Sequence, residues 1–270
     1  MNMPATRRPH NAVPAPKQPI ALLSDFGTRD GYIGAVKGVL CRLAPGVPLL
    51  DITHDIPPGD IAAARWTLLN CVREFPPGTV FWAVVDPGVG TERPPLAVAY
   101  GKRWFVAPGN GILDWVLGKG AKAVRLQPGK VGIKELSRTF HGRDLFAPAA
   151  ALLATGTPLD SLGKPFTLDL THMGLPKPRR DGQGWMGEVL GVDRFGNVVT
   201  NLPGKLWAEG CRLAAGNLLV DGCYRTYDDI PLGKPGVLVS SLGTLEAAMR
   251  GKSFAAESGV IAGDRVRWFG

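Results

Sequence analysis

Apolar runs alternate with amphipathic stretches along the first two thirds of the chain. Short β-prone runs predict strands at 20–23, 47–52, 79–85, 96–100 and 103–106. Apolar residues at helical spacing predict helices at 33–43, 60–75 and 143–154. Asp60 can cap the second helix, because its carboxylate can accept hydrogen bonds from the free N–H groups of a first turn. This order predicts a Rossmann-like three-layer α/β domain with a largely parallel sheet.

The pattern changes near residue 180. The segment LPKPRRDG at 175–182 has the composition of a linker. Beyond it, short strands with frequent glycine are expected at 185–192, 198–202, 218–220, 237–240 and 265–268. This pattern is typical of a small β-barrel. We therefore expect a Pro-rich, disordered leader at 1–18, an N-terminal α/β domain at 19–178 and a C-terminal β-barrel domain at 183–270.

Composition narrows the class of protein. The net charge is +8, but the basic residues form short pairs and no basic face with interleaved aromatics, so nucleic-acid binding is not favoured. The chain has no apolar run long enough to span a bilayer, and 1–18 lacks a signal-peptide core. Its four cysteines (Cys41, Cys71, Cys211 and Cys223) form no C-x-x-C pair. These features predict a cytoplasmic protein with reduced thiols and no zinc knuckle.

Polar side chains follow four predicted strands at their carboxyl ends: Asp25, Asp51, Asp86 and Asn110. Ligands of open α/β sheets bind beyond these ends. A single Asp or Asn at such a place is commonly a turn residue. Four consecutive polar strand ends favour a binding site.

The segment SDFGTRDG at 24–31 supplies two carboxylates, Asp25 and Asp30. One can accept two hydrogen bonds from a ribose diol and the other can hold an ammonium group. The alternative for Asp30 is an N-cap of the following helix.

Two further segments carry charged groups that suit catalysis. In VDPGVGTER at 85–93, Arg93 can fold back onto Asp86, although the same pair can be a purely structural ion pair. In TFHGRD at 139–144, His141 precedes a helix and can carry a proton near neutral pH, although a lone histidine can also be structural. The segment GNGILD at 109–114 lacks the third glycine of a dinucleotide fingerprint.

Together these segments resemble the S-adenosylmethionine hydrolases, also called hydroxide adenosyltransferases, which are similar to the bacterial fluorinase and chlorinase. The matching stretches are SDFGTRDGY (24–32), DITHDIPPGD (51–60), FPPGTVFWAVVDPGVGTERPPLA (75–97), APGNGIL (107–113), TFHGRDLFAPAAA (139–151) and DRFGNVVTN (193–201). The resemblance implies an N-terminal α/β domain, a C-terminal β-barrel and a homotrimer with each site between two subunits. It implies that water attacks the ribose C5′ carbon of S-adenosylmethionine, which is a substrate and not a cofactor.

The resemblance also implies roles for individual residues. Asp86, Arg93 and His141 fall on the catalytic triad. Asp25 falls on the ribose-diol carboxylate, Asp30 and Asp193 on groups near the methionine amine, and Phe195 and Asn197 on the adenine contacts. Asn110 lies at the fourth strand end and is a further candidate for substrate binding. The methionine carboxylate is expected near 240–243.

Three alternatives stay open. A halide-using adenosyltransferase is disfavoured because the halogenases differ at the Asp86 and His141 positions, and because Val89 and Gly142 replace a threonine and a serine of the fluorinase. A metal-dependent hydrolase would use His54, Asp51, Asp55 and His141, which are suitable ligand types. A nucleoside or nucleic-acid binding protein without catalysis is the third alternative, and its binding to nucleic acid would depend strongly on salt.

In the hydrolase mechanism the sulfonium is already an activated leaving group, so no metal or cofactor is expected. The difficulty is the nucleophile, since water is weak. We expect Arg93 to stabilise the developing hydroxide and either His141 or Asp86 to take its proton.

Overall fold

The computed structural model describes residues 17–117, 120–167 and 176–270. Most of the expected leader, and the segment 168–175 before the expected linker, lie outside these residues. The strands are β1 (Ile20–Ser24), β2 (Leu49–Thr53), β3 (Val80–Val84), β4 (Pro95–Tyr100), β5 (Arg103–Pro108), β6 (Lys122–Leu126), β7 (Gly163–Pro165), β8 (Arg179–Asp181), β9 (Gly184–Val192), β10 (Val198–Pro203), β11 (Arg212–Ala215), β12 (Leu218–Asp221), β13 (Pro235–Val239), β14 (Thr244–Met249) and β15 (Arg265–Phe269). The α-helices are α1 (Tyr32–Leu43), α2 (Ile61–Cys71), α3 (Asp114–Leu117), α4 (Ala147–Ala154) and α5 (Phe254–Ser258).

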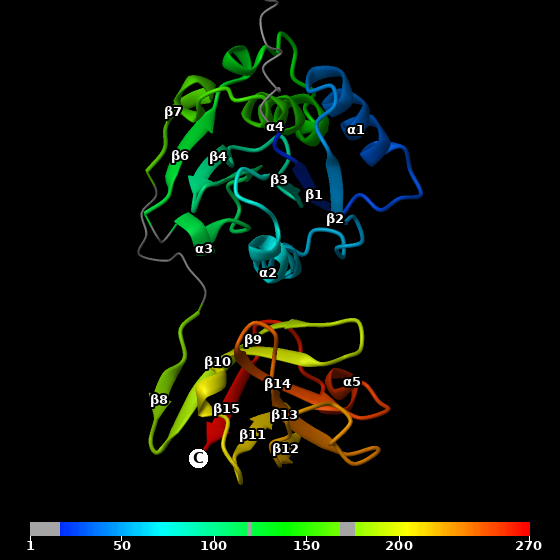
Figure 1. The fold of residues 1–270 in the computed structure, drawn as a ribbon, viewed down its shortest axis with the longest axis vertical. Helices are drawn as coiled ribbons and strands as arrows, with labels where there is room; N and C mark the ends of the chain where they lie inside the picture. Colours follow the sequence, from blue (N-terminus) through cyan, green and yellow to red (C-terminus); the bar gives the residue numbers. More distant parts are fainter. Residues whose placement is uncertain (1–16, 118–119, 168–175) are drawn as a thin grey trace, which may run out of the picture.

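The first sheet forms the α/β part of the molecule, residues 20–165 (Figure 1). Its strand order is β2-β1-β3-β5-β4-β6-β7. The pairs β1–β2, β1–β3 and β3–β5 are parallel, whereas β4–β5, β4–β6 and β6–β7 are antiparallel. The expected α/β class is confirmed, but the sheet is parallel in one half only.

Helices cover both faces of this sheet, as Figure 1 shows, because the side chains of each buried strand alternate between two apolar cores. Ile20 and Leu22 belong to the core under α1 and α4, whereas Ala21 and Leu23 belong to the core under α2 and α3. Asp60 caps α2 as predicted, with its carboxylate accepting a hydrogen bond from the Ala63 N–H at 2.8 Å. The result is three layers, with the carboxyl ends of the parallel strands at one edge.

The second sheet forms the barrel part, residues 179–269, which confirms the expected C-terminal barrel. Its strand order is β12-β11-β15-β9-β10-β14-β13, and β8 pairs with β9. An isolated bridge between Cys223 and Val237 brings the segment after β12 beside β13, so the sheet nearly closes on itself. The barrel part contacts the α/β part where the Trp66 ring of α2 packs on Gly191 of β9. A Cβ at Gly191 would lie 2.6 Å from that ring.

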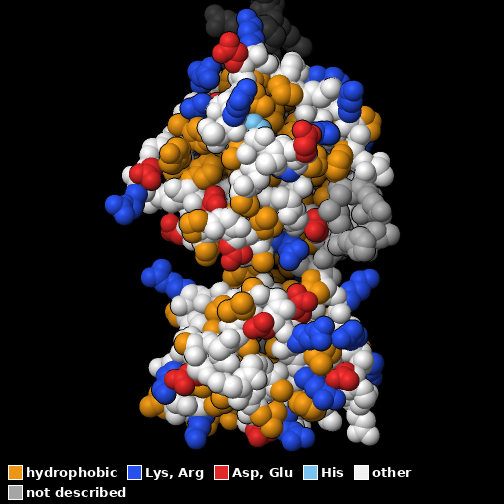
Figure 2. Space-filling view, turned by 180° about the vertical axis from the view of Figure 1, so that it is seen from behind, with side chains coloured by type: hydrophobic (Ala, Val, Ile, Leu, Met, Phe, Trp, Pro, Cys, Tyr) orange, Lys and Arg blue, Asp and Glu red, His pale blue; other side chains and the backbone are white. Residues whose placement is uncertain are grey.

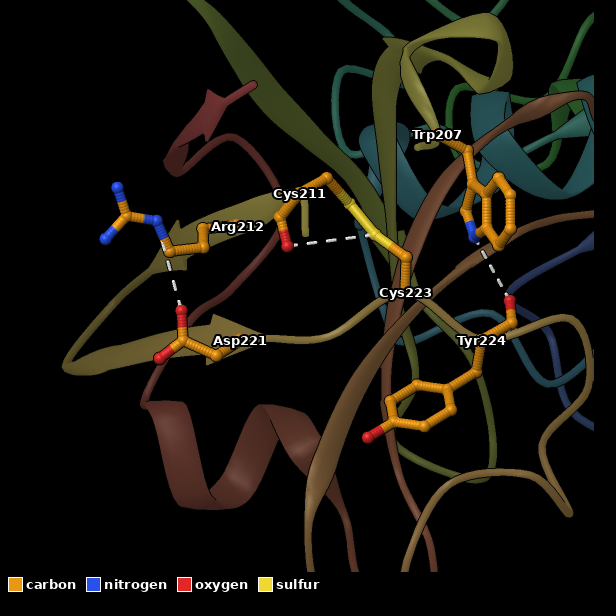
Figure 3. The surroundings of a disulfide bond; sticks show 6 residues. All are labelled: Trp207, Cys211, Arg212, Asp221, Cys223 and Tyr224. Atoms are coloured by element: carbon orange, nitrogen blue, oxygen red, sulfur yellow. Dashed lines mark hydrogen bonds and ion pairs between the residues drawn. A yellow bond between two sulfur atoms is a disulfide. The ribbon is translucent and has the colours of Figure 1, made fainter. Parts of the chain in front are cut away.

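Cys211 and Cys223 form a disulfide, contrary to the expectation of reduced thiols (Figure 3). The two residues flank the β11–β12 hairpin. Beside the bond, the Trp207 indole N–H donates to the Tyr224 carbonyl oxygen at 3.2 Å. Cys41 and Cys71 are free. Within the described part of the chain, no helix combines the length and the apolar character needed to cross a bilayer.

Candidate active site

A cavity of about 540 Å³ opens at the carboxyl ends of β1 and β3. We call it the N-pocket. Its lining includes Asp25, Asp86 and His141 together with an aromatic wall of Phe26, Tyr32 and Phe140. These rings contact one another at centroid distances of 5.5 to 6.3 Å. The predicted strand-end site is therefore a cavity lined by both polar groups and aromatic rings.

Arg93 joins Asp86 to His141. Its Nε donates to Asp86 Oδ1 at 2.9 Å, one terminal nitrogen donates to Asp86 Oδ2, and the same nitrogen donates to His141 Nδ1 at 2.8 Å. The Asp86 and Arg93 side chains are only 6% and 9% exposed, so little water screens the pair. The guanidinium also lies 5.4 Å from the Phe146 ring centre. The structure thus brings the three predicted catalytic residues into one connected group.

The hydrogen bond from Arg93 fixes the protonation of His141. A guanidinium donates and cannot accept, so His141 Nδ1 must be the acceptor and the ring hydrogen sits on Nε2. Burial and the adjacent Arg93 charge lower the pKa of His141, and they outweigh the opposing effects of Asp86, Asp144 and the Ser137 backbone. His141 is therefore neutral at neutral pH, with its one lone pair directed at Arg93.

Two glycines allow this geometry. Gly90 has φ +81°, and a Cβ there would lie 2.7 Å from the Arg138 carbonyl oxygen, so the 86–93 loop needs glycine to turn back against that backbone. Gly142 follows His141 in a π-helical turn (Gly142–Phe146), a distortion found often at functional sites. A Cβ on Gly142 would lie 3.1 Å from the Phe26 ring, so a larger side chain would crowd the N-pocket wall.

Asp25 is held by the backbone at the mouth of the N-pocket. Its Oδ2 accepts a hydrogen bond from the Gly59 N–H at 2.9 Å. The second oxygen, Oδ1, accepts no hydrogen bond from the described residues, and Asp25 lines the cavity. A carboxylate fixed by one oxygen and open at the other suits a diol.

A second cavity, of about 560 Å³, lies in the barrel part, and we call it the C-pocket. It is lined by Asp193, Phe195, Asn197, Tyr227, Ile230, Met249, Arg250, Gly251 and Lys252. Asp193 accepts hydrogen bonds from the N–H groups of Phe195 and Asn197, both at 2.9 Å, and from the Asn197 amide. The Phe195 ring is 77% exposed. The structure therefore gathers Asp193 and the predicted adenine contacts, but in a cavity separate from the N-pocket.

Three predicted site residues lie outside both cavity linings: Arg93, which reaches the N-pocket only through Asp86 and His141, and also Asp30 and Asn110. Asp30 is exposed, and it does not cap α1 either, since Gly31 holds the N-cap position without a side-chain bond. Asn110 donates from Nδ2 to the Val85 carbonyl oxygen at 2.8 Å, and its buried Oδ1 has no hydrogen-bond partner among the described residues. Asn110 thus holds the strand end before Asp86 in place and does not face the N-pocket.

Sequence reasoning missed a buried carboxyl group, Glu246, which is bonded to the C-pocket residue Tyr227. The Tyr227 hydroxyl donates to Glu246 Oε1 at 2.6 Å. Burial raises the pKa of Glu246, and the Asp193 charge raises it further, whereas the Tyr227 hydrogen bond lowers it. Glu246 lies in a segment, TLEAAM, that reads as helical by composition, so no strand signal marked it.

The alternative metal ligands do not form one cluster. His54 contacts Asp51 and Ser24, whereas His141 belongs to the Arg93 group. Asp55 is exposed. In the ranges 17–117, 120–167 and 176–270, no three His, Cys, Asp or Glu side chains are arranged to hold a metal ion.

On the face shown in Figure 2, Lys and Arg side chains are distributed over both parts of the molecule, with Asp and Glu between them. A nucleic-acid site needs a continuous basic patch. This face therefore offers no support for the nucleic-acid alternative.

Comparison with known proteins identifies the relatives of the chain. Residues 20–163 match the family model of the SAM hydroxide adenosyltransferase N-terminal domain, and residues 187–267 match that of the C-terminal domain. An (R)-S-adenosyl-L-methionine hydrolase of Thermus thermophilus is 38% identical over 93% of this chain and 99% of its own length. A fluorinase of an Actinoplanes species is 30% identical over 70% of this chain and 74% of its own. The crystal structure of an uncharacterized conserved protein from Thermotoga maritima superposes with a TM-score of 0.84 at 33% identity, over 92% of this chain and 99% of that one.

Proposed function

The chain belongs to the family of SAM hydroxide adenosyltransferases, and on this premise we propose that it hydrolyses S-adenosyl-L-methionine to adenosine and L-methionine. The observation that carries the proposal is the Asp86–Arg93–His141 group, of which Asp86 and His141 line the N-pocket together with Asp25. The name of the Thermus relative specifies the R configuration at sulfur. We extend that stereochemistry to this chain as part of the proposal.

In the proposed reaction, the oxygen of one water attacks C5′ in line with the C5′–S bond. That bond breaks, and its electron pair stays on the methionine sulfur, which leaves as a neutral thioether. Arg93 stabilises the negative charge that develops on the attacking oxygen. Asp86 accepts the proton, because the lone pair of His141 already accepts from Arg93, whereas each Asp86 oxygen keeps a second lone pair. The proton then passes to solvent.

His141 serves this reaction by orienting Arg93. Its Nδ1 and the Asp86 carboxylate hold the guanidinium from two sides. A guanidinium fixed in this way needs no reorganisation when charge develops, which is the basis of electrostatic catalysis. We therefore propose that Asp86 and Arg93 act directly on the reacting water, whereas His141 orients the Arg93 guanidinium.

The two separate cavities support a site shared between subunits. Asp25 in the N-pocket would hold the ribose diol, whereas Phe195 and Asn197 in the C-pocket would hold the adenine, with Asp193 and Asp30 near the methionine amine. These two sets of residues line two different cavities of one chain, so one substrate contacts both sets only where two such cavities meet. The implied homotrimer, in which the N-pocket of one subunit meets the C-pocket of the next, solves this problem and is part of the proposal.

A halide-using adenosyltransferase is the second candidate function, favoured only by the fluorinase among the relatives. Asp86 weighs against it, because a carboxylate beside the nucleophile site can take the proton of an attacking water, whereas a halide has no proton to give up. Chloride dependence of the products separates the two functions.

The deciding experiment incubates the purified protein with S-adenosylmethionine, each sulfur epimer separately, in a chelator and low-halide buffer. We expect adenosine and methionine from wild type and neither from Asp86→Ala, with wild-type circular dichroism as the folding control. A halogenated nucleoside on adding chloride would support the second candidate. Intact substrate with and without chloride would overturn both.

We propose that the reaction needs no metal or cofactor, because a sulfonium leaves without a Lewis acid or a general acid, and the chelator in the same assay tests this. The cytoplasmic location also stays a proposal. The disulfide Cys211–Cys223 weighs against it, since structural disulfides are typical of oxidising compartments.

A further inference from the structure

A chain of hydrogen bonds runs beneath the N-pocket, from the surface of α1 to the end of β1. Lys37 Nζ donates to Asp51 Oδ2 at 2.7 Å, and Asp51 Oδ1 lies 3.1 Å from His54 Nε2. His54 Nδ1 lies 2.8 Å from Ser24 Oγ. Ser24 is 0% exposed and His54 is 4% exposed, so water cannot replace the inner bonds of this chain.

The direction of each bond follows from Asp51. Partial burial raises the pKa of Asp51, but the hydrogen bonds and charges of Lys37 and His54 outweigh it and keep the carboxylate ionised. An ionised carboxylate only accepts, so His54 Nε2 carries the ring hydrogen and donates it to Asp51. In the neutral ring Nδ1 is then an acceptor, and the Ser24 hydroxyl donates to it.

This orientation leaves the Ser24 oxygen free to accept from the backbone of the site. The Phe26 N–H donates to Ser24 Oγ at 3.3 Å, and the Gly27 N–H donates to the His54 carbonyl oxygen at 2.8 Å. His54 therefore holds the chain after Asp25 in two ways, through Ser24 and through its own backbone. Gly27 has φ +65°, so the segment turns sharply at the point where it is held.

Ser24, His54 and Asp51 have the side-chain types and contacts of a nucleophilic triad, but Ser24 cannot act as the nucleophile. It is fully buried, its hydrogen points to His54 and its oxygen accepts from Phe26. A nucleophilic serine must meet substrate at an open site. The group therefore acts on the backbone of the site and not on a substrate.

We propose that His54 is a positioning residue for substrate binding: set in one tautomer by Asp51, it orients Ser24 and so fixes the segment that presents Asp25 and Phe26 to the N-pocket. The inference rests on the proposed function for the identity of the substrate. Asp25 binds the ribose, which does not change between substrate and transition state. Losing its position weakens both complexes alike and raises KM more than it lowers kcat.

Two substitutions of His54 separate the bond to Ser24 from the bond to Asp51. The amide oxygen of His54→Asn can take the place of Nδ1 and accept from Ser24, whereas the longer His54→Gln reaches toward Asp51 instead. We expect His54→Gln to raise KM for S-adenosylmethionine about tenfold with kcat within about twofold of wild type. We expect His54→Asn to stay within about threefold of wild type in both constants. Equal KM values for the two variants would overturn the inference.

Two further measurements keep the test decisive. Leu126→Ala, a buried substitution in β6 away from the N-pocket, controls for general destabilisation and should lower the melting temperature without changing KM. Hydrogen exchange of peptides covering 24–32 should speed up in His54→Gln and in Ser24→Ala, but not in His54→Asn. Unchanged exchange in both variants contradicts the inference, and Ser24→Ala carries the test if His54→Gln does not fold. If wild type leaves S-adenosylmethionine intact, the proposed function fails, while hydrogen exchange still decides whether His54 holds this segment.

Discussion

At the scale of single residues, Arg93 connects two residues of the N-pocket lining, Asp86 and His141, and its guanidinium also lies against the Phe146 ring. In the proposed reaction its charge matters most when the attacking oxygen becomes anionic. Arg93→Ala should therefore lower kcat by about 10²- to 10³-fold and change the Kd for substrate much less. Steady-state kinetics with calorimetric titration measure the two effects. A wild-type kcat in this variant would remove Arg93 from the mechanism.

His141 gives a prediction about pH. Its pKa is lowered by burial and by Arg93, so the neutral ring that accepts from Arg93 persists below the ordinary value of 6.5. As pH falls through the lowered pKa, protonation of Nδ1 opposes the adjacent guanidinium and activity should drop. The acid limb of kcat/KM should thus lie below pH 6.5. His141→Asn, which accepts through its amide oxygen but does not titrate, should lose this limb; a limb that persists unchanged belongs to another group.

The sequence predicts a site residue when its role follows from its motif and chemical type. It does not predict the role of a residue that depends on where the side chain points in the fold. Asp86, Arg93 and His141 are predicted as a triad because their motifs resemble those of the hydrolase family, and the structure brings the three side chains together. Asn110 had the same position at a strand end, but its amide donates to the Val85 carbonyl and faces away from the N-pocket. The direction of a side chain depends on neighbouring strands, and one segment of sequence does not contain that information.

At the scale of elements, strands were predicted where apolar residues are β-branched or aromatic and missed where they are not. β14 (TLEAAM) consists largely of good helix formers, yet it is paired on both sides by β10 and β13. Tertiary pairing overrides local propensity there. The antiparallel β4–β5 pair follows from a two-residue turn at Gly101 and Lys102, both with positive φ, which is the geometry of a tight hairpin. A turn of two residues cannot join parallel strands, so the sheet is mixed.

The β11–β12 hairpin supplies a prediction about thiols. Cys211 and Cys223 are bonded across it, whereas Cys41 is exposed and burial raises the pKa of the Cys71 thiol to about 11. Alkylation without a reductant should therefore label Cys41 rapidly and Cys71 slowly, since the thiolate is the reactive species. Cys211 and Cys223 should react only after reduction. Peptide mass mapping checks all four sites, and rapid labelling of Cys211 without reduction would mean that the hairpin thiols are free.

At the scale of the whole molecule, one chain carries two separate cavities. The N-pocket holds the charged groups and the C-pocket holds the exposed Phe195 ring, and the α/β and barrel parts touch elsewhere, through Trp66 and Gly191. Family resemblance predicted both sets of residues and also their division between subunits. The expected division of the site between two subunits does not follow from composition or periodicity. These patterns describe one chain and say nothing of the symmetry of an oligomer.

The shared site is tested by mixing two inactive chains. Asp86→Ala removes chemistry from the N-pocket, and Phe195→Asp places a charge where the adenine would stack in the C-pocket. Each variant alone should be inactive, but in co-expressed mixed trimers some sites combine an intact N-pocket from one subunit with an intact C-pocket from the next. If equal amounts of the two variant chains assemble at random in a head-to-tail ring, about a quarter of the sites combine two intact halves. The mixture should then show about a quarter of the wild-type activity. Co-expression of Asp86→Ala with Arg93→Ala is the matched control, because both changes lie in the N-pocket and no intact site can form. Recovery only in the first pair, with a trimeric mass by light scattering, is expected; no recovery in either would place the whole site within one chain.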